Sequence, residues 1–192
     1  MEHQGDKKSI INDNDKRSFL KIIREYSILV LICIISAVLL KTFVIERADV
    51  IGSSMRPTLH NRDVVLVEKL SCILDKYKTG EIVIFNSHDE NNEIYIKRVI
   101  AGSGETVEIK NNKVYVNDKK LNEGYLSKDT VTGEGDFLAN NQKYTVPKGY
   151  VFVMGDNRGN SLDSRIIGPV KIKDIEGHVI LRVFPLKSLR TF

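Results

Sequence analysis

The chain has 192 residues, of which 42% are hydrophobic, and a formal net charge of +4. This length allows one ordinary domain plus an additional segment, and the hydrophobic content is sufficient for a core. The lysines are interleaved with acidic residues, so no basic stripe indicates a nucleic-acid partner.

The longest uncharged stretch runs from Tyr26 to Leu40 and is followed by Lys41. About 20 residues of α-helix rise about 30 Å, which is enough to cross a bilayer core if Lys41 extends its amine to the interface. A cleaved signal peptide and a buried core helix are the alternatives. The 25 residues before the stretch, and the lack of a clear small-x-small pair after it, favour an uncleaved signal anchor. We therefore expect residues 26–45 to form a single transmembrane helix.

The cations on either side of this anchor indicate its orientation. Those before it outnumber those shortly after it: Lys7, Lys8, Lys16, Arg17, Lys21 and Arg24, against Lys41, Arg47 and Arg56. Because cytoplasmic flanks are richer in lysine and arginine, we expect residues 1–25 to be a cytoplasmic segment and residues 46–192 to be extracytoplasmic. Within the former, the polar stretch Met1–Asp15 is expected to be disordered.

The part of the chain after the anchor has the pattern of a mainly β domain, with short β-branched runs separated by Gly, Asn, Asp or Pro. The expected strands are Val64–Val67, Ile82–Phe85, Ile94–Ile100, Val107–Ile109, Val114–Val116, Tyr150–Met154 and His178–Phe184. Asn111 and Asn112 tolerate positive φ angles and predict a hairpin turn. The polar stretch 117–142 has no clear period, and we expect a loop-rich insertion there that tolerates change.

Neither metal chemistry nor a histidine base is indicated. The two cysteines, Cys33 in the expected anchor and Cys72 in the body, are not expected to pair. The histidines are isolated from one another, and no HExxH or CxxC spacing occurs. We expect no metal site and no cofactor.

Lys97 is unusual because its strand, Ile94–Ile100, has a pattern that predicts partial burial. On spacing alone, a lysine that points to solvent is the favoured interpretation. If the side chain instead faces a dry site, desolvation lowers its pKa and yields a neutral amine that can act as a base. Its reference pKa of about 10.4 would need to fall by about 2 to 3 units for work near neutral pH.

Two further segments could supply partners for such a base. Gly52–Leu59 places Ser54 among small residues just after the anchor, and a serine hydroxyl becomes a good nucleophile only when a base removes its proton. The segment Gly155–Arg165 faintly suggests a calcium loop, but its glycine falls at the fourth position and Ile167 occupies the place of the closing glutamate. A polar turn that orients a Ser/Lys dyad fits better.

Three motifs resemble the sequence boxes of type I signal peptidases, the membrane-anchored serine proteases that cleave leader peptides from exported proteins. They are Ser54-Met55-x-Pro57-Thr58-Leu59, Tyr95-Ile96-Lys97-Arg98-Val99 and Gly155-Asp156-Asn157-Arg158-x-Asn160-Ser161-x-Asp163-Ser164-Arg165. The resemblance covers residues 26–184 and is closest to the compact form common in Gram-positive bacteria. It implies a single N-terminal transmembrane helix followed by a β-rich catalytic domain, in a single-pass protein of the cell membrane.

The resemblance implies a role for each matching residue. Ser54 would be the nucleophile and Lys97 the general base. Ser161 would orient the Lys97 amine through a hydrogen bond, while Asp163 and Arg165 would form a structural ion pair.

The oxyanion hole would use the backbone N–H of Ser54. Some family members add a hydroxyl two residues before the nucleophile, but Gly52 occupies that position here. A side-chain donor is therefore absent there, which leaves open whether Ser53 compensates.

By the same resemblance, an extended substrate would lie along two segments of the body, with small side chains in shallow pockets as in an Ala-x-Ala preference. The implied substrate-binding residues are Val50, Ile51, Met55, Leu59, Tyr95 and Ile96. The implied partners are preproteins with small residues before the cleavage site and the lipid bilayer, without nucleic acid. The oligomeric state is not indicated.

Two other functions compete with a signal peptidase. A self-cleaving regulator of the Ser/Lys type predicts a soluble DNA-binding N-terminus and an internal scissile bond, and the chain displays neither. An anchored binding domain with a decayed site predicts loss of Ser54 or Lys97, and both are present. The sequence therefore favours a membrane-anchored serine endopeptidase.

Overall fold

The computed structural model describes residues 13–70, 77–88 and 92–192. The chain divides into two compact units, Met1–Thr42 and Phe43–Phe192. The expectations for residues 1–12 and for Cys72 lie outside the described residues.

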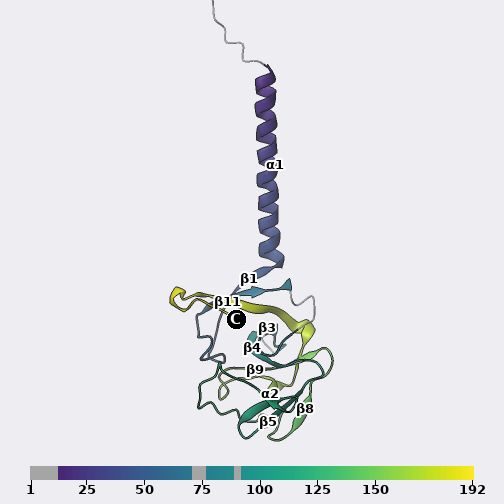
Figure 1. Cartoon of the computed structure of the whole chain (residues 1–192), viewed down its shortest axis with the longest axis vertical. Helices are drawn as coiled ribbons and strands as arrows, with labels where there is room; N and C mark the ends of the chain where they lie inside the picture. Colours follow the sequence, from purple (N-terminus) through teal and green to yellow (C-terminus); the bar gives the residue numbers. More distant parts are fainter. Residues whose placement is uncertain (1–12, 71–76, 89–91) are drawn as a thin grey trace, which may run out of the picture. The chain divides into compact units, whose positions relative to one another are not determined.

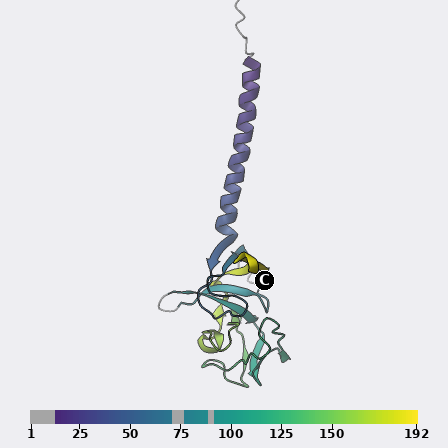
Figure 2. The ribbon, with the colours of Figure 1, turned by 90° about the vertical axis from the view of Figure 1, so that its left-hand side faces the viewer.

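The first unit contains one continuous helix, α1 (Asp13–Phe43; Figures 1 and 2). It begins well before the expected anchor, so the expectation of disorder is wrong for residues 13–15, and it ends before Ile45, which belongs to a strand. Its described large apolar side chains are about half exposed or more, and charged residues occupy the turns before Tyr26. Within the described residues, no helix combines the length and apolarity needed to cross a bilayer, so the expected span 26–45 is not supported.

The larger sheet of the second unit has eight antiparallel strands. They are β1 (Ile45–Asp49), β2 (Val64–Glu68), β3 (Ile82–Asn86), β4 (Ile94–Ala101), β9 (Tyr150–Met154), β10 (Val170–Lys171), β11 (Ile175–Phe184) and β12 (Arg190–Thr191). Their order is β1-β2-β11-β3-β4-β9-β10, and β12 pairs with β11. The predictions for β2, β3, β4, β9 and most of β11 are confirmed, whereas β1, β10 and β12 were not predicted.

A smaller sheet lies at the end of the domain opposite β1 (Figures 1 and 2). Its strands are β5 (Thr106–Lys110), β6 (Lys113–Val116), β7 (Lys119–Lys120) and β8 (Lys143–Thr145), in the order β7-β6-β5-β8. The predicted hairpin is confirmed, because Asn111 and Asn112 connect β5 to β6 with φ angles of 49° and 59°. A short helix, α2 (Ser164–Ile167), and two 3₁₀ turns, η2 (Ile172–Asp174) and η3 (Leu186–Ser188), complete the described elements.

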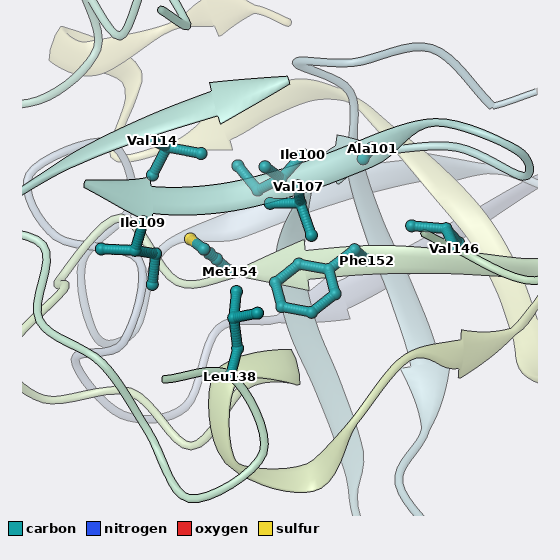
Figure 3. Close-up of a cluster of buried hydrophobic side chains, with 9 residues drawn as sticks. All are labelled: Ile100, Ala101, Val107, Ile109, Val114, Leu138, Val146, Phe152 and Met154. Atoms are coloured by element: carbon teal, nitrogen blue, oxygen red, sulfur yellow. The ribbon is translucent and has the colours of Figure 1, made fainter. Parts of the chain in front are cut away.

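The expected insertion 117–142 is mostly irregular, as predicted, but it is not a superficial loop. Thr132 and Leu138 are fully buried, and the backbone N–H groups of Phe137 and Leu138 donate to the carbonyl of Arg165 at 2.8 and 3.1 Å. Leu138 also belongs to the apolar cluster between the two sheets (Figure 3). The interpretation of this segment as tolerant of change is therefore wrong for its buried residues.

Among the described residues the core consists of three apolar clusters, and two of these clusters contain or adjoin residues of the site. The cluster drawn in Figure 3 joins β4 and β9 to the smaller sheet. A second cluster packs Val50, Met55 and Leu59 against β2 and β3. Because burying a large apolar side chain contributes about 1.5 to 3 kcal/mol, this second cluster holds the loop after β1 firmly against the sheet.

Candidate active site

The candidate site lies where the loop after β1 meets strand β4. There the Nζ of Lys97 donates hydrogen bonds to the Oγ of Ser54 at 3.0 Å and to the carbonyl of Ile96 at 3.1 Å. Lys97 is only 4% exposed, so the solvent-facing interpretation of this lysine is wrong. The structure thus brings together two predicted residues that are 43 positions apart in the chain.

Burial lowers the pKa of Lys97 from 10.5 to about 8, because the dry site penalises the ammonium form. The carboxylate of Asp163 acts in the opposite direction and raises this pKa. The ring of Tyr95, whose centroid is 4.9 Å from Nζ, also favours the charged form. With a pKa of about 8, roughly one lysine in ten is neutral at pH 7.

The loop that carries Ser54 is fixed from inside the domain. Met55 and Leu59 are buried in the second cluster, and the N–H of Leu59 donates to the carbonyl of Met55 at 2.9 Å. They do not line the surface, so the expectation that Met55 and Leu59 shape substrate pockets is not confirmed. Their burial instead sets the position of Ser54.

A groove of about 650 Å³ contains both Ser54 and Lys97 and extends between β1 and β4. Four predicted substrate-binding residues line it, namely Val50, Ile51, Tyr95 and Ile96. A second cavity of about 700 Å³, next to Arg62 and Phe184, contains neither Ser54 nor Lys97. The groove with the amine and the hydroxyl is therefore the candidate site.

Both strands that flank the groove have open edges there. Among the described strands, β1 pairs only with β2, and β4 pairs with β9 only from Arg98 to Ala101. The N-terminal half of β4, Ile94–Lys97, therefore has a strand neighbour only on its β3 side. An extended peptide can pair with such an edge through backbone hydrogen bonds.

The turn that begins at Gly155 packs directly against Ser54. The N–H of Asn157 donates to the carbonyl of Ser54 at 2.8 Å. A Cβ on Gly155 would lie 2.2 Å from the Oγ of Ser161 and 2.6 Å from the carbonyl oxygen of Ser54. Only glycine allows this close approach.

The expected ion pair of this turn is present, but the expected hydrogen bond of Ser161 is not. Arg165 donates from Nε and Nη2 to the two carboxylate oxygens of Asp163, both at 2.8 Å. Asp163 also accepts from the N–H of Gly155 at 2.9 Å and caps α2. The Oγ of Ser161 is buried and has no hydrogen-bond partner within the described residues, because the Lys97 amine is directed to Ser54 and Ile96.

The residues before Ser54 show why a side-chain donor is absent at position 52. Gly52 has a φ of +92°, a conformation that strains any residue with a Cβ. Ser53 faces the 155–165 turn, since its Oγ accepts from Asn160 at 3.0 Å and its carbonyl accepts from the side chain of Asn157 at 3.1 Å. The N–H of Ser54 makes no hydrogen bond within the described part of the chain and is free to donate to a substrate.

Sequence reasoning assigned no role to a buried charge network beside Lys97. Arg98 donates from Nε and Nη2 to the two carboxylate oxygens of Asp156, at 2.9 and 2.7 Å, and the hydroxyl of Thr58 donates to the same carboxylate. Thr58, Arg98 and Asp156 each belong to a different one of the three sequence motifs, so the network connects all three motifs. The sequence held one signal for this network, namely the charged residue Arg98 directly after Lys97.

Among the described residues, no cluster of histidine, cysteine or acidic side chains could hold a metal ion.

Comparisons with known proteins identify the family of this chain. The model of the family "Signal peptidase, peptidase S26" matches residues 23–184. Signal peptidase I P of Bacillus subtilis subsp. natto is 38% identical over 182 residues, which cover 93% of this chain and 97% of the relative. Signal peptidase I T of Bacillus subtilis (strain 168) is 39% identical over 175 residues, which cover 86% of this chain and 88% of the relative. The crystal structure of a signal peptidase I from Enterococcus faecalis V583 is 33% identical, with a TM-score of 0.45, and covers 54% of this chain and 97% of that chain.

The family model and the curated Bacillus relatives define an enzyme of the hydrolase class, a peptidase. The chain belongs to the signal peptidase family, peptidase S26, and its function is the removal of signal peptides from preproteins. The resemblance to type I signal peptidases, predicted from three short motifs, is confirmed. The prediction of a β-rich domain of the signal peptidase type is also confirmed, and the structure adds that its sheets are antiparallel.

Proposed function

We propose that this signal peptidase is a serine endopeptidase with Ser54 as the nucleophile and Lys97 as the general base. The 3.0 Å contact between the Nζ of Lys97 and the Oγ of Ser54, at one side of an open groove, carries the proposal. A pKa of about 8 supports it, because a base is most effective when its pKa lies near the working pH.

The reaction begins when the Oγ of Ser54 attacks the scissile carbonyl while the neutral amine of Lys97 takes the hydroxyl proton. The negative charge that develops on the carbonyl oxygen faces the N–H of Ser54. When this intermediate collapses, the C–N bond breaks and the Lys97 ammonium gives its proton to the leaving amine of the mature protein. An ester then joins the signal peptide to the Oγ of Ser54, and water attacks it while Lys97 takes a proton from the water. The bond between the acyl carbon and Oγ breaks and Lys97 returns the proton to Oγ, which releases the signal peptide and restores the Ser54 hydroxyl.

The substrate lies extended in the groove, with its small side chains against the apolar wall. The open edges of β1 and of Ile94–Lys97 offer backbone hydrogen bonds to a peptide between them. Val50, Ile51 and Ile96 leave shallow space there, which matches small residues before the scissile bond.

We extend the proposal to attachment at a membrane, with the N-terminus cytoplasmic and Phe43–Phe192 outside. The support is the exposed apolar surface of α1 from Ile28 to Val38, since such a surface requires lipid or another apolar partner. The uncharged sequence continues to Leu40, and the cations of residues 16–24 precede it. Alkaline carbonate extraction and protease treatment of intact cells test both points, and a chain that is released into the supernatant contradicts the attachment.

Cleavage of a preprotein by purified full-length variants tests the two catalytic roles. Ser54→Ala and Lys97→Ala should each lower kcat/KM by at least about 1,000-fold, because neither half of the dyad works alone. Lys110→Ala, at an exposed lysine, and His60→Ala should leave the rate unchanged. Retained activity in Ser54→Ala or Lys97→Ala would refute the assigned roles, and a loss in His60→Ala would point to a histidine base.

A further inference from the structure

Three residues of the irregular 117–142 segment enclose the guanidinium of Arg158. Its Nη2 forms an ion pair with the Oε1 of Glu123, and its Nη1 donates to the hydroxyl of Thr132 at 2.7 Å. The hydroxyl of Tyr125 is 3.4 Å from Nη2. The Arg158 side chain is 0% exposed, so these partners replace the water that it loses on folding.

Tyr125 also contacts the second buried guanidinium, that of Arg98. The Cζ of Arg98 lies 3.9 Å from the centroid of the Tyr125 ring, the distance of a close cation–π contact. The Tyr125 hydroxyl donates to the Oε1 of Glu123 at 3.2 Å. Burial, and next the charge of Glu123, raise the pKa of Tyr125 well above its usual 10.0, so the phenol remains a protonated donor throughout the range in which Lys97 titrates.

Both guanidiniums contact the Gly155–Asp156 turn beside the dyad. Arg98 follows Lys97 in β4 and holds Asp156 through two hydrogen bonds. Arg158 donates from Nε to the carbonyl of Gly155 at 3.0 Å. Gly155 and Asp156 start the turn that packs against the Ser54 backbone. Tyr125 is therefore connected to Lys97 through its chain neighbour Arg98, and to Ser54 through Arg158 and Gly155.

The two buried guanidiniums, those of Arg98 and Arg158, are both paired with a carboxylate only because the 117–142 segment supplies Glu123. Arg98 and Arg158 are two buried cations, and the turn itself supplies one direct carboxylate partner, Asp156. Glu123 provides the second negative charge, at 10% side-chain exposure. Removing one member of a buried ion pair leaves an uncompensated charge, which the surrounding structure relieves by moving.

We propose that Tyr125 and Glu123 are positioning residues of this signal peptidase, which keep the Gly155–Asp156 turn and Arg98 in the arrangement that brings Ser54 Oγ and Lys97 Nζ together. The inference rests on the proposed roles of Ser54 and Lys97. It gives the 117–142 segment a part in catalysis, although none of its residues lines the groove.

Three variants and one matched control test the proposal by steady-state cleavage of a preprotein and by thermal unfolding. Tyr125→Leu removes the ring over Arg98, Tyr125→Phe removes only the hydroxyl, and Glu123→Gln removes the charge. Tyr125→Leu and Glu123→Gln should lower kcat by about tenfold or more with KM changed by less than about twofold, because a misplaced catalytic group slows the chemical step. Tyr125→Phe should lie between these and the wild type, and Lys128→Ala, at an exposed residue of the same segment, should match the wild type.

A purely structural role predicts a different result. In that case each variant, assayed well below its own unfolding temperature, keeps the wild-type kcat and shows only a lower Tm, and this outcome overturns the proposal. If Tyr125→Leu does not fold, Glu123→Gln and Tyr125→Phe decide, since both are nearly isosteric with the native residues.

The dyad variants separate the two hypotheses. If Ser54→Ala or Lys97→Ala remains active, the proposed function fails. If both are inactive while Tyr125→Leu and Glu123→Gln keep their kcat, only the positioning role fails.

Discussion

The N–H of Asn157 donates a hydrogen bond of 2.8 Å to the carbonyl of Ser54, across 103 positions of sequence. This contact ties the 155–165 turn to the backbone of the proposed nucleophile. The turn approaches so closely because residue 155 is glycine, and any displacement of the turn is transmitted to Ser54.

Gly155→Ala is therefore expected to damage both stability and catalysis. Its Cβ would lie 2.6 Å from the carbonyl oxygen of Ser54 and equally close to the Cβ of Ser161, so the turn must move away. We expect a loss of about 1 to 3 kcal/mol in the free energy of unfolding and a fall in kcat of about 100-fold. Urea unfolding and preprotein cleavage measure the two effects.

Gly159→Ala is the matched control in the same turn, because a Cβ there meets nothing within 4 Å. It should retain the wild-type kcat. An active Gly155→Ala enzyme would show that the turn can shift without moving Ser54.

The pH dependence of cleavage follows from the lowered pKa of Lys97. The base must be neutral in order to accept the Ser54 proton, so activity is low below this pKa and rises as pH increases through it. The value of kcat/KM for the free enzyme should rise with an apparent pKa of about 8. A limb near 6.5 would instead indicate titration of a histidine, and a limb near 10.5 would indicate a lysine without the desolvation described above.

The same burial makes Lys97 costly for folding at neutral pH. The folded-state pKa of about 8 lies below the unfolded value of 10.5, so the unfolded chain binds more protons between these two pH values. Stability therefore rises with pH in this window, and the full penalty, about 3 kcal/mol, applies below pH 8. Lys97→Met removes the charge at similar volume and should stabilise the protein at pH 7.

The gain from Lys97→Met should decline as the pH is raised from 8 to 10, because the buried lysine of the folded wild type loses its proton in this range and no longer carries a desolvated charge. Denaturant unfolding of wild type and variant at pH 7 and pH 10 measures this. A gain that is equal at both pH values would contradict the assignment of the penalty to desolvation of the ammonium.

The strands that could be predicted from the sequence are the buried ones, because burial requires a run of β-branched or aromatic residues between turn residues. Tyr150–Met154 is a β-branched and aromatic run between turn residues, and its predicted bounds are those of β9. β10 and β12 have two residues each and exist only because β9 and β11 pair with them, which no local pattern reports. β1 was missed because its first residue, Ile45, continues the apolar run of the preceding helix.

The same distinction applies to the site, where some residues lie in a local sequence motif and others do not. Ser54 and Lys97 could be predicted because each lies in a short motif, and chemistry requires a base for the serine. Glu123 and Tyr125 could not, since they are polar residues in an aperiodic segment whose partner, Arg158, follows 35 and 33 positions later. The Ser161 hydrogen bond was expected from the resemblance, but in the structure the Lys97 amine has other acceptors.

Asp163→Asn separates two effects of one carboxylate. Asp163 is fully buried, pairs with Arg165 and accepts from the N–H of Gly155, so its neutralisation should cost about 3 kcal/mol of folding free energy. Its charge also raises the pKa of Lys97, so the variant should cleave with an apparent pKa below that of the wild type. Asp136→Asn, at an exposed carboxylate, should change neither quantity. A kcat/KM profile that stays at the wild-type pKa, measured below the unfolding temperature of the variant, would show that Asp163 acts on the site only through the structure of the turn.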